Sequence, residues 1–488
     1  MKTQKKDGGN GMKERHVKVG HDHVEDKKWI YAIGPVIGFL FCLIYLNRAV
    51  IDVTYTDYIR LINSYLPDVW NPKKFFVADV LTRIPLNYLE RAINVTWFGY
   101  NTMIEMVLGV LGLGLSAGVI AVYCAKHRIR FGWYFLLMAV LFSLNKWEMI
   151  TNGTGWIHFA AFACFYYHYL ILDRVYRGEG KRGDSIRLCL LPFLVTLGVA
   201  GPYCAIYSVT VILACLFAAV RKIAKAKGIQ KVKNDVIQWL LYAGCTVIPL
   251  LLYMWSNSHT VEEHAGAVDA SLFGTLLEQP LFFAEFFLKS FASTVLGDEC
   301  IRKICTQEWQ ILILGALVLG CYFFALYLNW SQKIYERTIF PLILLAAGGM
   351  NHVLILLSRW IFLKPDYGMS SRYALQFQVG ILGILLTFAF ALQKSYKKKP
   401  NRGLWIGCAL IGSIFLFGNT FTTYSEWNTA PYRKQNLTIK REAAFHYEEL
   451  SDKELEDIFQ YKKGPDQIRN ALRILKDHSW NVFREQED

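Results

Sequence analysis

The residues best suited to chemistry lie at or near the ends of long apolar stretches. A carboxylate can remove a proton from an acceptor hydroxyl, and a guanidinium can neutralise a departing phosphate with two parallel hydrogen bonds. Ionisable groups in or beside a bilayer are costly and are functional candidates by default. These candidates are Asp52, Asp57, Arg60, Glu105, Trp147, Glu148, His352, Arg359, Arg372 and Tyr373. Because acids are scarce in the middle of the stretches, we predict chemistry at one membrane face.

The elements that must position these residues are eleven apolar stretches. A helix needs ~20 mostly apolar residues to cross ~30 Å of hydrocarbon. Hydrophobic residues make up 54% of the chain and charged residues 19%, against about 25% charged in soluble domains. This composition excludes a soluble enzyme, a disordered chain and a secreted disulfide scaffold. We predict an all-α polytopic membrane protein with spans at 29–49, 102–125, 131–146, 155–172, 188–201, 202–220, 235–255, 309–328, 338–358, 376–393 and 404–421.

The net charge of +14 is distributed unevenly along the chain. Lys and Arg concentrate in the segment before the first span and in alternate short loops, at 1–28, 126–130, 173–187, 221–234, 329–337 and 394–403. Because cytoplasmic loops carry such an excess, we predict that the amino terminus lies inside and the carboxyl terminus outside. The positive charge then reflects topology, and no nucleic-acid partner is expected.

Three units are predicted from this layout. Residues 1–28 form a basic tail expected to be disordered, residues 29–421 the transmembrane domain, and residues 422–488 an external tail. In the tail we expect helices at 450–461 and 466–483, the first with the capping-box pair Ser451 and Glu454. Such a tail has little core of its own and should pack on the external loops.

Two external loops contain amphipathic segments. In the first loop, 50–96, we predict a helix at 57–66 and a second amphipathic stretch at 73–95, interrupted by Pro85, with Arg83, Glu90 and Arg91 on its polar positions. In the loop at 256–307, residues 271–294 carry a phenylalanine stripe and three charges, which favours a helix lying in the membrane interface. Cys300 and Cys305 in this loop are either a local disulfide or two free thiols.

Several of these features occur together in one known group. They are an acid and two interfacial helices after the first span, the turn Trp147-Glu148…Gly153…Trp156, Ser371-Arg372-Tyr373, and the ending ALRILKDHSWNVF at 471–483. In this layout the chain resembles the GT-C superfamily of polytopic membrane glycosyltransferases, in its bacterial, polyprenyl-phosphate-sugar-dependent form. The resemblance covers most of the chain, although the first loop lacks the Asp-Glu or Glu-x-Asp pair of some families.

The resemblance implies transfer of a sugar from a polyprenyl phosphate to an envelope glycopolymer or another glycan acceptor. The reaction would occur on the extracytoplasmic face of the plasma (inner) membrane, with membrane lipids as further partners. Asp57 is the expected general base, with Asp52 second. The expected donor-phosphate group is Arg372, Tyr373, Arg359 and Arg60, and the sugar and acceptor group is Trp147, Glu148, Glu105 and His352. No cofactor or metal is expected, because one arginine can neutralise a monophosphate leaving group.

Other interpretations stay open from the sequence alone. Asp57 fits a helix cap, Arg372 fits an interfacial anchor, and Trp147 with Glu148 fits an aromatic-belt residue beside a capping acid. The phenylalanine stripe fits either a guide for an isoprenoid chain or ordinary membrane packing. At the level of function, the alternatives are a transporter or flippase for lipid-linked sugars or polysaccharide, and a non-catalytic scaffold of the same fold.

Overall fold

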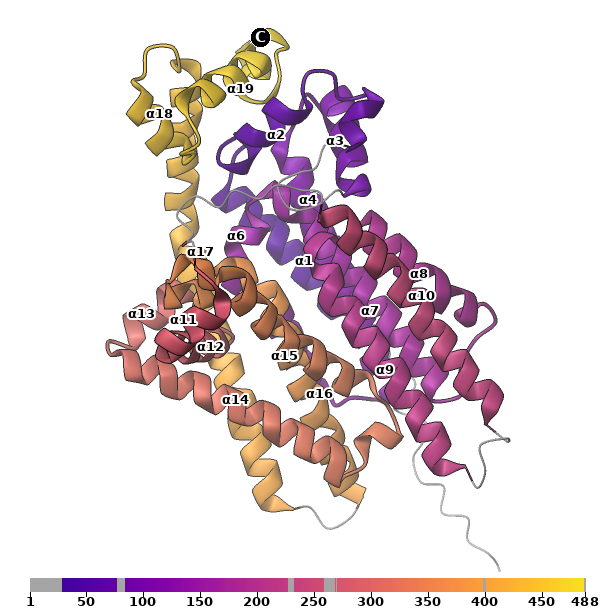
Figure 1. Ribbon diagram of the computed structural model, residues 1–488. Helices are drawn as coiled ribbons and strands as arrows, with labels where there is room; N and C mark the ends of the chain where they lie inside the picture. Colours follow the sequence, from indigo (N-terminus) through magenta and orange to yellow (C-terminus); the bar gives the residue numbers. More distant parts are fainter. Residues whose placement is uncertain are drawn as a thin grey trace, which may run out of the picture.

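The computed structural model describes residues 29–76, 84–226, 232–258, 268, 270–397 and 401–486 (Figure 1). Over these residues the chain folds as an all-helical protein. No strand occurs in these ranges. The predicted tail at 1–28 and Arg83 lie outside them. The α-helices are α1 (Ile30–Ala49), α2 (Asp57–Tyr65), α3 (Pro85–Phe98), α4 (Thr102–His127), α5 (Phe131–Leu141), α6 (Trp147–Ile150), α7 (Trp156–Tyr176), α8 (Asp184–Gly198), α9 (Cys204–Lys225), α10 (Lys233–Asn257), α11 (Leu272–Glu278), α12 (Pro280–Ala292), α13 (Asp298–Ile304), α14 (Glu308–Ser331), α15 (Phe340–Arg359), α16 (Ala374–Lys397), α17 (Arg402–Phe445), α18 (Asp452–Phe459) and α19 (Pro465–Asp477).

Eight helical segments among the described residues are long and apolar enough to cross a membrane, by length and composition. They contain α1, α4, α9, α10, α14, α15, α16 and α17. This confirms a polytopic helical protein. The other three predicted spans correspond to α5, α7 and α8, of 11, 21 and 15 residues, and do not meet both criteria. The eleven-span count therefore stays a prediction.

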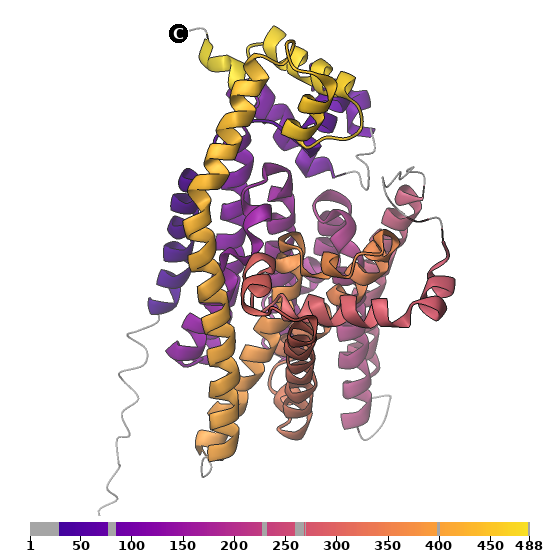
Figure 2. The same cartoon turned by 90° about the vertical axis from the view of Figure 1, so that its left-hand side faces the viewer.

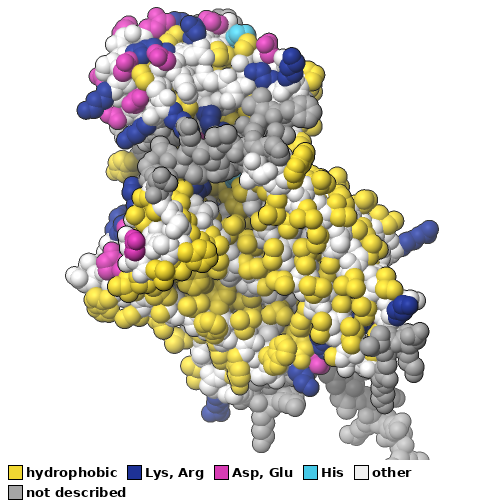
Figure 3. Space-filling view, in the orientation of Figure 1, with side chains coloured by type: hydrophobic (Ala, Val, Ile, Leu, Met, Phe, Trp, Pro, Cys, Tyr) yellow, Lys and Arg dark blue, Asp and Glu magenta, His cyan; other side chains and the backbone are white. Residues whose placement is uncertain are grey.

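The surface divides into an apolar body and a charged end. Figure 3 shows hydrophobic side chains over the body that contains the long helices, and acidic and basic side chains on the part above it. Exposed apolar side chains recur along the long helices, for example Leu111, Leu213 and Leu317. Contiguous exposed apolar surface of this kind suits lipid rather than water.

Close helix packing in the body centres on α16. Its apolar window is fully buried, in contrast to the partly exposed windows of the other seven segments. Gly348 of α15 and Gly380 of α16 face each other so closely that a Cβ added to Gly348 would lie 2.3 Å from the Cα of Gly380. Small residues permit such backbone approach in membrane helices. The segment preceding α16, which contains Arg372, is thereby anchored to the centre of the body.

A cap covers one end of the body and consists of α2, α3, α18, α19 and the 3₁₀ helix η11 (Asn481–Gln486) (Figures 1 and 2). The backbone N–H of Thr56, before α2, donates to the carbonyl of Phe459 at the end of α18 over 2.9 Å. The Asn481 amide of η11 donates to Asp52 over 2.5 Å. The first loop and the carboxyl-terminal segment therefore pack together, as expected for a tail with little core of its own.

The helix α17 connects body and cap without interruption. We expected the last span to end near residue 421, but the helix continues to Phe445 (Figure 2). The hydropathy signal stops where the apolar residues stop, whereas backbone hydrogen bonding does not depend on that signal. Farther along, the predicted capping box of Ser451 and Glu454 at α18 and the start of α19 at Pro465 are confirmed.

Two predicted amphipathic segments differ from their expected form. The segment 271–294 is two helices, α11 and α12, because Pro280 begins a new helix, and both run across the molecule in Figure 2. Its phenylalanines Phe282, Phe283 and Phe286 are buried in a cluster with Ile355, Trp360, Tyr373 and Phe377. They pack on protein, which favours the packing interpretation over a guide for an isoprenoid chain.

The second difference concerns α3. Its polar residues Glu90 and Arg91 are buried, at 8% and 2% exposure, whereas Leu89 and Trp97 are 42% and 69% exposed. The helix begins at Pro85, where a proline is tolerated because the first helical N–H lacks a partner. Some of the large apolar side chains of α3 thus point outward, whereas its charges point into the cap.

Candidate functional site

Arg372 and Glu148 form the centre of the site. Arg372 lies in the 3₁₀ turn η10 (Ser371–Tyr373) that leads into α16, and Glu148 lies on the short helix α6. The Nε of Arg372 donates to Oε1 of Glu148, and the Ser371 hydroxyl donates to Oε2 over 3.0 Å. The Arg372 side chain is still 53% exposed. Two predicted residues that are more than 220 positions apart in the sequence are thus joined, and about half of the Arg372 side chain stays exposed.

Asp57 faces this pair from the cap. It is the first residue of α2, its side chain is 53% exposed, and its carboxylate lies 3.7 Å from the guanidinium of Arg60 one turn later. Asp57 is also close enough to Arg372 for a direct electrostatic interaction. An exposed carboxylate of the cap and an exposed guanidinium of the body therefore lie within range of each other's charge.

Tyr55 lies beside the same charges. Burial, and next the negative charge of Glu148, raise the pKa of Tyr55 to about 12. The Nζ of Lys440, from α17, lies 5.4 Å from the centre of the Tyr55 ring. The phenol therefore stays protonated at neutral pH and can donate a hydrogen bond.

Trp147 and α17 form the other wall of the site. The guanidinium of Arg433 lies 3.2 Å from the centre of the Trp147 ring. It also donates to both oxygens of Glu426, over 2.6 and 2.7 Å, and to Glu299 over 2.8 Å. Sequence reasoning missed Arg433 and Glu426 because they were assigned to a separate tail. Their seven-residue spacing, almost two helical turns, was the signal that could have found them.

A small cavity lies between these groups. It is lined by Asn145, Trp147, Gly297, Asp298, Glu299, Cys300, Ser371, Thr422, Ser425 and Glu426. Its interior has room for about one water molecule. All eleven cysteines are free thiols, so Cys300 and Cys305 are not bonded to each other. As packed, the site presents a polar surface with a narrow recess.

Asp52, the second candidate base, lies elsewhere. Its Oδ1 accepts hydrogen bonds from the backbone N–H and hydroxyl of Thr102, over 2.8 and 2.7 Å, and from Asn481. Burial raises the pKa of Asp52, although these hydrogen bonds oppose the rise. Asp52 therefore joins the start of α4 to η11, and the structure does not bring it to Arg372.

Glu105 is also separate from Arg372. It accepts a hydrogen bond from the Tyr58 hydroxyl over 2.7 Å in a fully buried cluster that includes Glu90 and Arg91. Burial, followed by the charge of Glu105, raises the pKa of Glu90 well above its usual range. The Glu90 carboxyl consequently favours its uncharged form at neutral pH.

The remaining predicted residues split between the site and the interior. Arg359 lies 6.0 Å from the centre of the Tyr373 ring, next to η10. His352 is fully buried between Phe291 and Phe377, whose ring centres lie 3.8 and 4.1 Å away, and its Nδ1 shares a 2.7 Å hydrogen bond with Ser290. His352 therefore packs among aromatic rings inside the body, and its assignment to the sugar and acceptor group stays a prediction.

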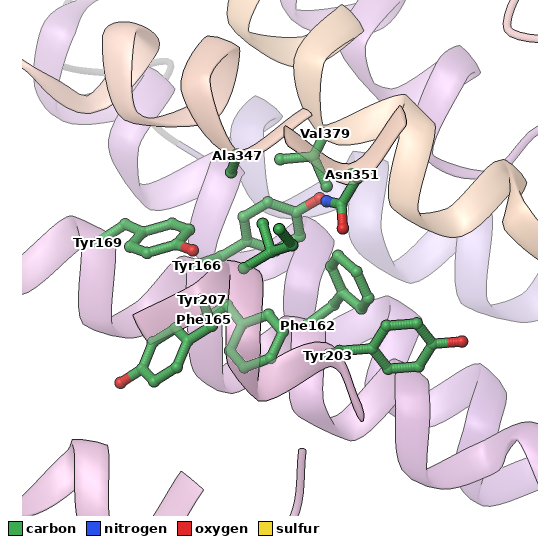
Figure 4. Close-up of a pocket in the computed structure, with 10 residues that line it drawn as sticks. Phe162, Phe165, Tyr166, Tyr169, Tyr203, Tyr207, Ala347, Asn351 and Val379 are labelled. Carbon is green, nitrogen blue, oxygen red and sulfur yellow. The ribbon is translucent and has the colours of Figure 1, made fainter. Parts of the chain in front are cut away.

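An aromatic cavity opens between α7, α9, α15 and α16 (Figure 4). Phenylalanine and tyrosine rings from α7 and α9 surround it, and Asn351 of α15 is its polar wall. The Tyr203 ring at its edge is close enough to Arg359 and Arg372 to interact with both charges. An apolar recess thus borders the charged site from within the body.

No group of three or more His, Cys, Asp or Glu side chains able to hold a metal ion occurs among the described residues. The charged groups of the site are mixed in sign, because Arg372 is paired with Glu148, and Arg433 with Glu426 and Glu299.

No known family, no curated protein and no solved structure matches this chain.

Proposed function

We propose that this protein is a membrane glycosyltransferase that uses a sugar linked to a polyprenyl phosphate. The observation that carries the proposal is that exposed Asp57 of the cap lies within electrostatic range of exposed Arg372 of the apolar body. A lipid phosphate lies at the boundary between apolar and polar surface, which is where Arg372 is held. The cap supplies the carboxylate from the aqueous side.

In this reaction the acceptor hydroxyl loses its proton to the Asp57 carboxylate while its oxygen bonds to the sugar carbon. The bond from that carbon to the phosphate oxygen breaks, and the phosphate leaves with the electron pair. Arg372 meets the developing charge, and Glu148 with Ser371 holds Arg372 in place. Trp147 and Arg433 border the space beside the phosphate. The step needs no cofactor.

We assign the cap to the extracytoplasmic face. The carboxyl ends of α9, α14 and α16 and the amino ends of α10, α15 and α17 lie at the end of the body opposite the cap (Figure 1). The segments of the sequence between these ends are among those rich in Lys and Arg, and such segments are cytoplasmic. The acceptor is then a glycan or glycopolymer of the envelope, and the protein is a multi-pass protein of the plasma membrane.

The test is a comparison of Asp57→Asn with Asp68→Asn, a matched change at another exposed Asp of the same loop. Transfer from polyprenyl-phosphate sugars should fall by about 10²–10⁴-fold in Asp57→Asn, the usual contribution of a general base, and persist in Asp68→Asn. Mass spectrometry of envelope glycopolymers from a deletion strain should show a missing sugar. Unchanged transfer by Asp57→Asn would remove this mechanism, and accumulation of an unmodified lipid-linked oligomer would indicate transport instead.

A further inference from the structure

A second small cavity lies deeper in the body and shares one residue with the cavity beside Trp147. The deeper cavity is lined by Val140, Asn145, Lys146, Thr294, Ala374, Gln378 and Asn419. Asn145 lines both. The two recesses are therefore neighbours that share Asn145 in their walls.

Two amide side chains in these walls have unused hydrogen-bonding capacity. Gln378, on α16, is 5% exposed, and neither its oxygen nor its nitrogen has a hydrogen-bond partner in the described part of the chain. Asn145 is also 5% exposed; its nitrogen donates to the carbonyl of Ser293 over 2.7 Å, and its Oδ1 is without a partner among the same residues. The Ser293 bond fixes the amide, so Oδ1 is an acceptor held in one orientation.

The other polar groups of the deeper cavity are already engaged. The Nζ of Lys146 donates to the carbonyls of Leu141 and Ser143 over 2.9 and 2.8 Å, at the end of α5. The amide nitrogen of Asn419 donates to the carbonyls of Thr294 and Phe415 over 3.1 and 3.0 Å. The groups left for a ligand are therefore two acceptors, the side-chain oxygens of Asn145 and Gln378, and one donor, the Gln378 nitrogen. All three belong to neutral amides.

This set of groups selects a class of ligand. A phosphate would meet two amide oxygens that repel it, and an ammonium group would leave the Gln378 nitrogen unused. A hydroxyl has one donor and two acceptor lone pairs, so it can donate to one of the amide oxygens and accept from the Gln378 nitrogen. Leaving a buried amide unpaired costs about 1–3 kcal/mol, so these positions are costly unless something pairs with them.

We propose that Asn145 and Gln378 form a subsite that binds a hydroxyl group of the transferred sugar, near the phosphate site of Arg372. The subsite rests on the proposed function for the identity of the ligand as a donor sugar. It makes Gln378 a specificity-determining residue. A site built to pair with a hydroxyl discriminates strongly against analogues that lack it.

The test uses the full chain in nanodiscs and measures the thermal stabilisation given by polyprenyl phosphate and by polyprenyl phosphate carrying glucose, galactose or mannose. At least one glycosylated lipid should stabilise the protein more than the bare lipid does. Gln378→Met should weaken binding of that lipid about tenfold, as expected for two neutral hydrogen bonds, and leave bare-lipid binding unchanged. Gln376→Met, at a buried glutamine that lines neither cavity, is the matched control and should keep the preference.

Other results overturn the subsite. A preference for the glycosylated lipid that survives Gln378→Met would refute it, as would equal stabilisation by bare and glycosylated lipids in the natural chain. A lower melting temperature of ligand-free Gln378→Met would show that the amide is paired internally. If none of the lipids binds, the assignment of the donor fails, and thermal stabilisation by free glucose, galactose and mannose then tests the subsite. Stabilisation of the natural chain by a free sugar that is lost in Gln378→Met supports the subsite. Absence of stabilisation by all three sugars refutes it.

Discussion

The ion pair of Arg433 and Glu426 gives the sharpest test of how α17 is held against the site. Methionine at position 433 keeps the length of the side chain and removes the guanidinium. Glu426, which is 4% exposed, would then retain the Tyr45 hydroxyl, at 2.7 Å, as its remaining partner. Removing one member of a buried ion pair costs about 3–5 kcal/mol, because the other charge stays buried without compensation.

The lower end of that range applies here. The Arg433 side chain is 19% exposed, so water screens part of the interaction. At about 2.1 cal/mol/K per residue, unfolding a chain of 488 residues has an entropy of roughly 1 kcal/mol/K. A loss of about 3 kcal/mol therefore lowers the melting temperature by about 3 °C.

The assay is thermal unfolding of the purified protein in one detergent, followed by intrinsic fluorescence. Arg441→Met is the matched control on the same helix, because Arg441 has a weak 3.9 Å contact with the adjacent Glu442. The double change Arg433→Met with Glu426→Gln should recover more than half of the loss, since it removes both charges and keeps a partner for Tyr45. The reasoning is refuted if Arg433→Met melts within 1 °C of the natural chain, or if the double variant is as unstable as the single one.

Two further predictions concern pH. Because the pKa of Glu90 is raised in the folded protein, its contribution to the free energy of unfolding is present below about pH 4.5, the usual carboxyl pKa, and is lost as pH rises through the raised value. The melting temperature of Glu90→Gln should therefore rise relative to that of the natural chain as pH increases from 5 to 9. A difference in melting temperature that stays constant over this range would contradict the prediction. Asp366 shows the opposite sign: burial opposes the shift, but ion pairs with Lys289 and Arg302, both at 2.7 Å, lower its pKa. Its contribution is present above about pH 3.8, the usual carboxyl pKa, and is lost as pH falls through the lowered value of the folded protein. Asp366→Asn should therefore be less stable than the natural chain at pH 6, and the gap should narrow as pH falls below about 3.8 in acid unfolding curves; a gap of the same size at pH 6 and pH 2 would exclude the ion pairs as its source.

Sequence patterns predicted the parts of the fold that depend on local composition. Apolar runs gave the long helices, and the Ser451–Glu454 spacing gave the capping box of α18. The same patterns failed for α3, whose charges point inward. Which face of a helix is buried depends on its neighbours, and the partner of Glu90 is Glu105 on another helix.

The candidate site was predictable as a set of residues but not as an arrangement. Glu148 and Arg372 were both chosen, yet no local signal connects residues so far apart. Asp52 and Asp57 both follow the first span, and only their tertiary contacts distinguish them. Asp52 accepts a hydrogen bond from Thr102, whereas Asp57 is exposed and lies within electrostatic range of Arg372. His352 was chosen because a polar residue in a span is unusual, and the structure places it among aromatic rings.

The uninterrupted course of α17 has a geometric consequence for how this protein can change over evolution. Along a helix each residue advances the chain by about 1.5 Å and turns it by about 100°. Inserting or deleting one residue between Phe421 and Glu426 would rotate everything beyond that point, including Arg433 and the last part of the cap, relative to the body. The number of residues in this stretch therefore sets how the last part of the cap is rotated about the axis of α17 relative to the body. Loops elsewhere can vary in length, whereas α17 can gain or lose only numbers of residues that restore this rotation.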